Sequence, residues 1–326
     1  MARYLTLLIV LLLMVPTPAL AAKDRVFSIE VDNDVLTPTD QYFTNGVRVS
    51  VAFGKAAQKP WMDRLADKIP FLSRTYNERI ISFALGQNIY TPSDTDPFTL
   101  TISDRPYAGW LYGELGIEVQ TDQVSEYFIV QAGMIGPASL ADRAQRSYHR
   151  LISVARPNGW AHQLSNEPGI VIGYQRVWKN NLGLGKGFEI SSNPHVGVAA
   201  GNVYTYAALG WTLRIGKGLS SENGPPPRIS PAFPGSGYFK TTSPVAWYLF
   251  AGVEGRAVAR DIFLDGNTFT NSHSVAKKHL VADFQFGIVV IAHGLRISYT
   301  HVFRSREFTL QPGRHEFSGV NIAFRF

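Results

Sequence analysis

Alternation of apolar and polar residues is the dominant pattern along this chain. In residues 320–326 every second side chain is apolar, and Asn321 and Arg325 stand on the opposite face. Residues 280–290 and 111–120 alternate in the same way, with acidic and amide side chains on the polar face. Such alternation places successive side chains on opposite sides of a β-strand. The pattern therefore predicts long strands with one apolar and one polar face.

Segments of this kind recur along the whole chain and number about twelve. In a soluble sandwich the polar face points to solvent, whereas in a membrane barrel it points to the lumen, and periodicity does not separate the two. The strand lengths, the even count and the C-terminal Phe326 favour an all-β fold, a transmembrane antiparallel β-barrel. The expected strands cover residues 25–34, 43–54, 78–90, 109–121, 124–136, 167–179, 187–200, 203–216, 243–259, 276–291, 294–304 and 316–326.

The connections between these strands differ in length from one end of the predicted barrel to the other. Most of those at one end are short, as periplasmic turns are, and long ones at the other end fit outer loops. Two connections at the periplasmic end are long: 55–77, predicted to hold a short helix around 61–69, and 217–242, whose Pro and Gly content predicts a loop. The long outer connections cover residues 35–42, 91–108, 137–166 and 260–275.

One outer loop has helical periodicity, and we expect a short helix there. Ser139 with Asp142 three residues later is typical of a helix start, and Pro157 of a stop. His149 falls at the edge of the apolar stripe of this helix, facing whatever the helix packs on. The stripe consists of Leu140, Ala144, Tyr148, Leu151, Ile152 and Ala155.

The first residues predict a secretory signal peptide. Arg3 precedes an apolar run over 5–15, and Ala19-Leu20-Ala21 supplies the small residues of a cleavage site. We expect residues 1–22 to be the signal peptide and 23–326 to form one barrel domain. No later stretch is apolar enough for a membrane helix.

Composition narrows the chemistry further. The chain has no cysteine, which excludes disulfides, zinc–thiolate sites and thiol nucleophiles. The formal net charge is +6, and for an exported protein this favours anionic lipid or lipopolysaccharide phosphate over nucleic acid as a partner. A positive surface of no special use fits the charge equally well.

Familiar hydrolase motifs are missing, and the first two strands carry the clearest cluster of oxygen donors. There is no Gly-x-Ser-x-Gly elbow and no His-Glu-x-x-His. Antiparallel pairing brings Asp34 and Thr44 together at the outer rim, with Asn33 beside them. Oxygen ligands of this kind suit a hard divalent cation such as Ca²⁺. The alternative is that Asn and Asp here only end a strand and start a turn.

Histidine is the other candidate for chemistry, because a neutral imidazole is the usual base for activating water. Among the eight histidines, His149 stands out through its place on the predicted outer-loop helix. By position alone, a surface role is the commoner one for any single histidine.

Several motifs together resemble the lipid A 3'-O-deacylase family of outer-membrane barrels, and the resemblance covers nearly the whole mature chain. Their order and spacing carry it more than any single motif. The matching segments are Val31-Asp32-Asn33-Asp34, Tyr42-Phe43-Thr44-Asn45-Gly46, Gln87-Asn88-Ile89-Tyr90-Thr91-Pro92-Ser93, Asp104-Arg105, Ile135-Gly136-Pro137, His149-Arg150, Trp160, Gln163 and Phe250-Ala251-Gly252-Val253-Glu254.

The resemblance implies a twelve-stranded barrel with a cation-dependent site at the outer rim, between the wall and a loop helix. Carried over by position, His149 is the base, Asn33 and Asp34 hold the cation and substrate, and Thr44 lies beside them. Tyr90 and Arg105 are then the expected substrate-binding residues. The implied substrate is lipid A of the outer membrane, attacked at its 3'-linked acyloxyacyl ester.

Two features depart from the family pattern. The best-known member places a Lys in the second outer loop, whereas residues 90–110 here contain no Lys and only one basic residue, Arg105. Strand parity also predicts that Asn33 and Asp34 point to opposite sides of the wall.

Four interpretations follow from the sequence. The leading one is a monomeric lipid A deacylase. The second is a catalytically silent barrel that binds lipopolysaccharide or acts structurally, and the missing Lys favours it. The others are a passive pore, which large inward side chains such as Tyr112, Tyr248 and Phe250 disfavour, and a soluble periplasmic β-protein.

Overall fold

The computed structural model describes residues 24–33, 42–95, 98–152, 157–222, 228–229, 237–240 and 243–326. The expected signal peptide, residues 1–22, lies outside this part of the chain and stays a prediction. None of the helices among the described residues combines the length and the apolar character that a membrane crossing requires.

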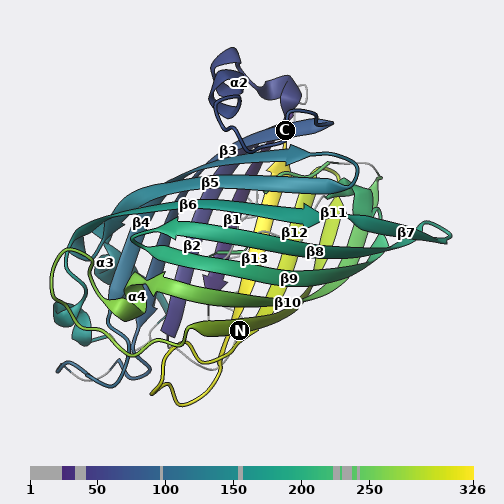
Figure 1. The fold of residues 1–326 in the computed structure, drawn as a ribbon. Helices are drawn as coiled ribbons and strands as arrows, with labels where there is room; N and C mark the ends of the chain where they lie inside the picture. The colour runs from purple at the N-terminus through teal and green to yellow at the C-terminus, as the bar shows by residue number, and fades with distance from the viewer. Residues whose placement is uncertain are drawn as a thin grey trace.

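Twelve antiparallel strands of the described chain form a closed barrel (Figure 1). Each strand pairs with its neighbours in chain order, β1 pairs with β13, and β6 pairs with β8 to complete the wall. The strands are β1 (Arg25–Asn33), β2 (Tyr42–Phe53), β3 (Glu78–Thr91), β4 (Ala108–Gln120), β5 (Val124–Ile135), β6 (Glu167–Trp178), β8 (Phe188–Gly201), β9 (Tyr204–Lys217), β10 (Val245–Asp261), β11 (Leu280–Ala292), β12 (Leu295–Arg304) and β13 (His315–Arg325).

The predicted barrel and its twelve strands are confirmed, with strand ends that differ by a few residues. A further short strand, β7 (Asn180–Gly185), pairs with the start of β8 and projects beyond the wall (Figure 1). It was not predicted, because its Asn and Gly residues are typical of turns.

The two faces of the strands separate apolar from polar side chains as a membrane barrel requires. On β11, Leu280 and Phe284 are 77% and 45% exposed on the outside, whereas Asp283 between them is 3% exposed and points inward. An exposed apolar face and a buried charged face are the reverse of a soluble sandwich. The soluble interpretation is therefore wrong.

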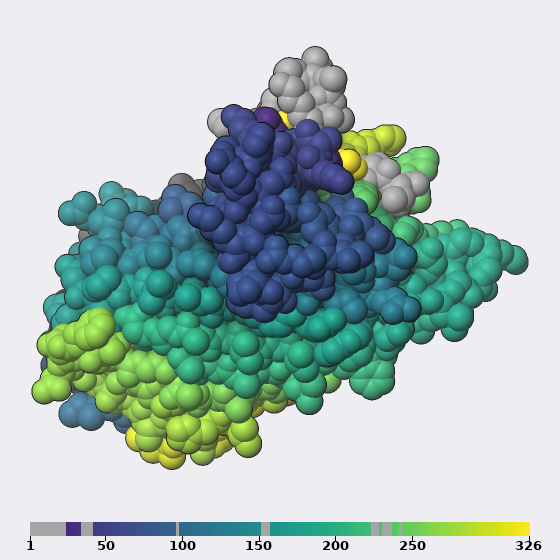
Figure 2. All heavy atoms as spheres, turned by 45° about the horizontal axis from the view of Figure 1, so that its top comes forward, coloured from purple at the N-terminus to yellow at the C-terminus, as the bar shows by residue number. Residues whose placement is uncertain are grey.

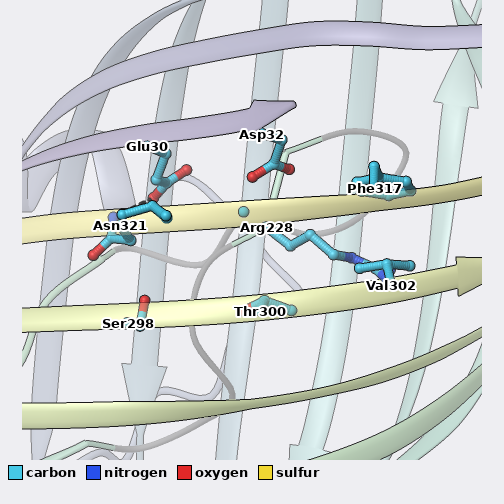
Figure 3. Close-up of a pocket in the computed structure, with 10 residues that line it drawn as sticks. Glu30, Asp32, Arg228, Ser298, Thr300, Val302, Phe317 and Asn321 are labelled. Carbon is cyan, nitrogen blue, oxygen red and sulfur yellow. Dashed lines mark hydrogen bonds between the residues drawn. The ribbon is translucent and has the colours of Figure 1, made fainter. Parts of the chain in front are cut away.

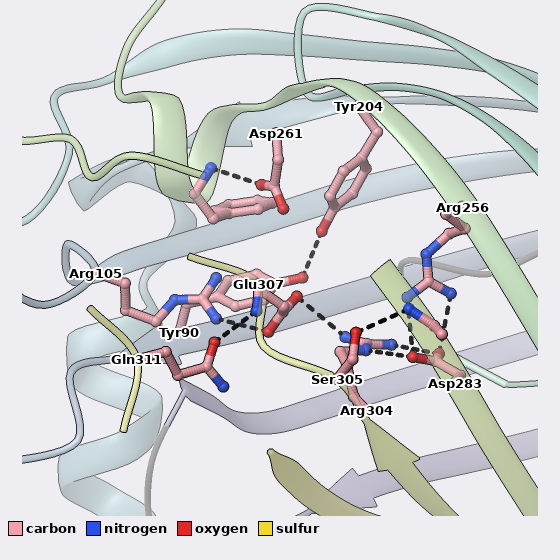
Figure 4. Close-up of polar contacts among 12 residues, drawn as sticks. Tyr90, Arg105, Tyr204, Arg256, Asp261, Asp283, Arg304, Ser305, Glu307 and Gln311 are labelled. Atoms are coloured by element: carbon pink, nitrogen blue, oxygen red, sulfur yellow. Dashed lines mark hydrogen bonds and ion pairs between the residues drawn. The ribbon is translucent and has the colours of Figure 1, made fainter. Parts of the chain in front are cut away.

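Charged and aromatic side chains fill the lumen. Arg48 of β2 binds Glu30 of β1 at 3.1 Å and Glu114 of β4 at 2.6 Å, with all three side chains buried. Asp283 is held between Arg256 and Arg304 in a second network nearer the outer mouth (Figure 4). Tyr112, Tyr248 and Phe250 also point inward and are buried, as predicted from their parity.

Between β9 and β10, the described residues 218–222, 228–229 and 237–240 pack inside the barrel or at its mouth instead of lying outside it as a simple loop. Glu222 binds Arg296 of β12, and the backbone N–H of Ile229 donates to the Asp32 carboxylate at 3.0 Å. Arg228 lies with Asp32 in a hollow of the lumen that β1, β12 and β13 surround (Figure 3). The prediction of a loop missed this, because composition does not show which side of a wall a segment packs on.

The end of the same connection that lies near β10 is held at the mouth of the barrel where Arg25 pairs with Phe326. Tyr238 donates a hydrogen bond to Asp24, and burial together with that carboxylate raises the pKa of the Tyr238 hydroxyl above its usual range. The hydroxyl therefore stays protonated and remains a donor. Short turns such as 121–123 and 293–294 lie at this end, which is the periplasmic one.

Helices lie outside the strands at both ends of the barrel. The connection 55–77 carries η1 (Lys55–Ala57) and α2 (Pro60–Ala66), near the predicted position, and stands on the outer wall at the periplasmic end (Figure 2). The outer end carries the remaining helices, η2 (Pro137–Ser139), α3 (Ala141–Ile152), η3 (Gly159–His162) and α4 (Ile262–Asp265), while η4 (Leu219–Ser221) belongs to the segment in the lumen.

Candidate functional site

Asn33 and Thr44 meet at the outer end of β1 and β2. The side-chain amide of Asn33 donates to the Thr44 carbonyl at 3.0 Å, and the two residues are 7% and 3% exposed. Asp32 points into the lumen, so Asn33 faces the outside of the wall. The prediction placed Asp34 next to Thr44, and among the described residues it is Asn33 that contacts Thr44.

A β-bulge turns Thr44 to the same outer face. In the pairing of β2 with β3, Phe43 stands opposite Tyr90 and Asn45 stands opposite Ile89, which leaves Thr44 as the extra residue. The Phe43 ring contacts Tyr90 inside the barrel, whereas the Thr44 hydroxyl hydrogen-bonds the Thr91 hydroxyl at 2.7 Å. A bulge re-aims a side chain in this way, because it breaks the alternation at one position.

Asp34, the carboxylate expected to complete this cluster, lies outside the described residues. The parity question for Asp34 therefore stays open. Within the described residues, no group of three or more His, Cys, Asp or Glu side chains is arranged to hold a metal ion. The described donors at the rim are the Asn33 amide and the hydroxyls of Thr44 and Thr91, which are hard oxygen ligands of the kind that Ca²⁺ accepts.

The loop helix α3 packs on the outside of the wall, against β3 and β4. Gly109 of β4 makes room for it, because a side chain there would collide with Ala141 and Ser139. Ala141 forms a buried apolar cluster with Ile89 of β3 and with Trp160. Ile89 and Thr91 lie on the same face of β3, two residues and about 7 Å apart along the strand.

His149 lies on the buried face of α3, not at its edge. Ala141, Gln145 and His149 follow one another at intervals of four residues and are 1%, 2% and 3% exposed. His149 faces the surface that the helix packs on, as predicted, but at the centre of the buried face. Leu140, which the predicted stripe included, precedes the helix in a left-handed conformation and stays 47% exposed. The small Ala141 lets this helix face approach the wall closely.

Gln145 and Trp160 support this face of the helix. The Trp160 indole N–H donates to the Gln145 side-chain oxygen at 2.8 Å, and both side chains are buried. Sequence reasoning did not single out Gln145 or Thr91 as site residues. The four-residue spacing from Gln145 to His149 was the available signal.

Tyr90 and Arg105 occupy the other side of the wall, at the outer mouth of the lumen (Figure 4). The Arg105 guanidinium lies 4.7 Å from the centre of the Tyr90 ring and binds Glu307 at 3.4 Å. Tyr90 stacks on Phe263 of α4 and shares a hydrogen bond with Tyr204. Arg105 is 1% exposed, so its charge is directed into the barrel and not toward the face that carries Asn33.

Comparison with known proteins identifies a family over nearly the full chain. Residues 5–326 match the family model described as outer membrane protein LpxR. The solved structure of LpxR from Salmonella typhimurium superposes with a TM-score of 0.75 at 20% identity, covering 92% of this chain and 100% of that one. No curated protein matches.

A second solved structure is less similar to this chain. The beta domain of the Bordetella autotransporter BrkA has a TM-score of 0.47 at 8% identity, covering 94% of this chain and 100% of that domain. At 20% identity, the likeness to the Salmonella structure supports the fold alone.

Proposed function

Because the chain belongs to the LpxR family of outer membrane proteins, as its motifs predicted, we propose that it is a lipid A deacylase of the outer membrane. The reaction we propose is hydrolysis of the 3'-linked acyloxyacyl ester of lipid A. The observation that carries the proposal is the placement of α3. The helix packs on the outer surface of the wall with His149 on its buried face, and Asn33 and Thr44 meet on the same outer surface.

His149 is the proposed general base. Its neutral imidazole accepts a proton from water, and the oxygen of that water attacks the ester carbonyl carbon. When the tetrahedral intermediate collapses, the fatty acid forms and the sugar oxygen leaves as an alcohol by taking the proton from His149. The burial of His149 excludes bulk water and fixes the orientation of its ring.

The oxygen-bearing side chains at the outer rim are proposed to bind the cation and to stabilise the oxyanion. Asn33 and Asp34 would hold a divalent cation such as Ca²⁺, which supplies positive charge next to the ester carbonyl when bound. Thr44, which contacts Asn33, would donate its hydroxyl to the developing oxyanion. Loss of one such donor typically costs roughly 10²–10³ in rate.

The substrate-binding role expected for Arg105 and Tyr90 fits the geometry less well. Both side chains are buried within the mouth of the barrel, and a lipid in the outer leaflet would not reach them without a rearrangement. We propose that they support the rim from inside, and that the positive charge of the missing Lys is not replaced by Arg105.

Mass spectrometry of lipid A tests the proposal directly. Lipid A would be extracted from outer membranes that contain this chain, with and without Ca²⁺, and from membranes that contain His149→Ala. We expect the loss of a 3' acyloxyacyl group that depends on both the cation and His149. Unchanged lipid A in membranes with a folded barrel would favour the second candidate, a silent barrel that binds lipopolysaccharide.

A further inference from the structure

The periplasmic connection 55–77 is a surface that the proposed reaction does not use, and we call it the basic module. It lies at the end of the barrel opposite α3 and stands out from the wall as the dark blue mass of Figure 2. Its helix α2 has only seven residues, so packing against the barrel must hold it in place.

The basic module covers wall surface that would otherwise face lipid. Met62 and Leu72 pack into one apolar cluster with outward side chains of β3, β4 and β5, among them Ile81, Ile117 and Phe128. The Glu126 carboxylate of β5 accepts a hydrogen bond from the backbone N–H of Ser73 at 2.9 Å. The module therefore sits beside the barrel at the level of the periplasmic leaflet, not free in the periplasm.

Both acidic side chains of the module are already paired with the wall. Asp63 and Asp67 each bind the Arg79 guanidinium of β3, Asp67 at 2.7 Å. These are the only acidic residues within 55–77. Arg79 offsets one of their two negative charges. Five basic residues against two acidic ones leave the charge that the module presents to its surroundings positive.

The exposed surface of the module combines cations with aromatic rings. Trp61 and Phe71 are 45% and 52% exposed, although each also touches a wall aromatic, Phe83 or Phe128. Half-exposed aromatic rings beside basic residues are typical of protein surfaces at the membrane–water interface. The exposed basic residues are Lys55, Lys59, Arg64, Lys68 and Arg74.

We propose that the basic module binds the head groups of anionic phospholipids in the periplasmic leaflet of the outer membrane. Trp61 and Phe71 enter the interface, while the five cations contact the phosphates. Lipopolysaccharide occupies the opposite leaflet, so it is not the ligand. Each basic residue near an anionic surface strengthens binding to that surface about fivefold. Several such residues together therefore favour anionic phospholipids over those without net charge.

Native mass spectrometry of the whole protein, released from mixed membranes of phosphatidylethanolamine and phosphatidylglycerol, tests this assignment. The probe is the ratio of the two lipids retained on the barrel. We expect the wild-type protein to retain more phosphatidylglycerol than its share of the membrane, and Lys59→Gln with Lys68→Gln to reduce that enrichment by up to roughly 25-fold. Trp61→Ser should weaken retention of both lipids.

Lys186→Gln with Lys217→Gln is the matched control, because it removes two cations from the same end of the barrel outside the module. An equal fall in the control, or a wild-type ratio equal to that of the membrane, would overturn the proposal. Retention of a protein partner in place of lipid would also overturn it. The readout does not use deacylation, so the proposal stands or falls independently of the proposed function.

Discussion

His149 is the residue on which the proposed chemistry depends most. We predict that His149→Gln lowers deacylation by roughly 10²–10⁴, the usual range for loss of a general base. Gln keeps most of the side-chain volume, which matters because His149 is 3% exposed. Turnover of lipid A by the purified barrel measures the effect, and folding is checked by the shift in gel mobility on heating.

Asp34 is predicted to act through charge. Asp34→Asn should reduce activity by roughly 10²–10³, because the amide keeps the oxygen donor but loses the negative charge that a divalent cation requires. Excess Ca²⁺ should restore part of the rate. Full activity at low Ca²⁺ in this variant would remove Asp34 from the site.

Arg105 is predicted to stabilise the mouth of the barrel and not to bind substrate. Arg105→Gln should lower the free energy of unfolding by about 1–3 kcal/mol, because the guanidinium is buried against Tyr90 and binds Glu307. The measurement is the rate at which protease cuts the outer loops, compared with KM for lipid A. A raised KM with unchanged protease resistance would show instead that Arg105 contacts the substrate.

At the scale of elements, α3 must lie close to β4 for His149 to reach the wall. Gly109→Val should push the helix away and abolish deacylation, because a side chain there would collide with Ala141. Gly113→Val is the control, since a Cβ at Gly113 meets nothing closer than 4.0 Å on the same face of the same strand. Lipid A turnover of both variants should be measured on barrels that resist heating equally. Equal activity in both variants would show that the position of α3 does not matter for the reaction.

The elements were the part of this protein that the sequence predicted best. Strands of twelve or so residues alternate because one face meets lipid and the other the lumen, so the pattern records both the strand and its orientation. The helix α3 was predicted, but its buried face was not, because periodicity favours the large Leu140 over the small Ala141. The bulge at Thr44 left no trace in the alternation, since a single extra residue at a strand end resembles a turn.

The roles of the functional residues depended on the family motifs more than on pattern. Asn33, Thr44 and His149 were singled out from their places at the strand ends and on the loop helix, and the motifs then gave them roles. Only the structure shows that Asn33 and Thr44 touch. Thr91 and Gln145 were missed as site residues, because their importance lies in contacts between elements far apart in the chain.

At the scale of the whole molecule, the lumen is too full to act as a pore. Arg48, Glu30 and Glu114 form one buried network inside it, while Glu222 and Arg296 pair in another part. We predict that the reconstituted protein gives no stable conductance in planar bilayers, under conditions where a sixteen-stranded porin does. Regular conductance steps would restore the pore interpretation. Because the barrel closes on itself, it needs no strand from a second copy, and the monomeric state stays a prediction.

The segment between β9 and β10 also constrains how this barrel is made. Ile229 lies within the lumen and donates to Asp32 of β1, yet four strands of the wall follow it in the chain. We expect the seam between β1 and β13 to close around this segment during assembly. In this order of assembly, the segment packs first, and β10 to β13 then join the wall and enclose it.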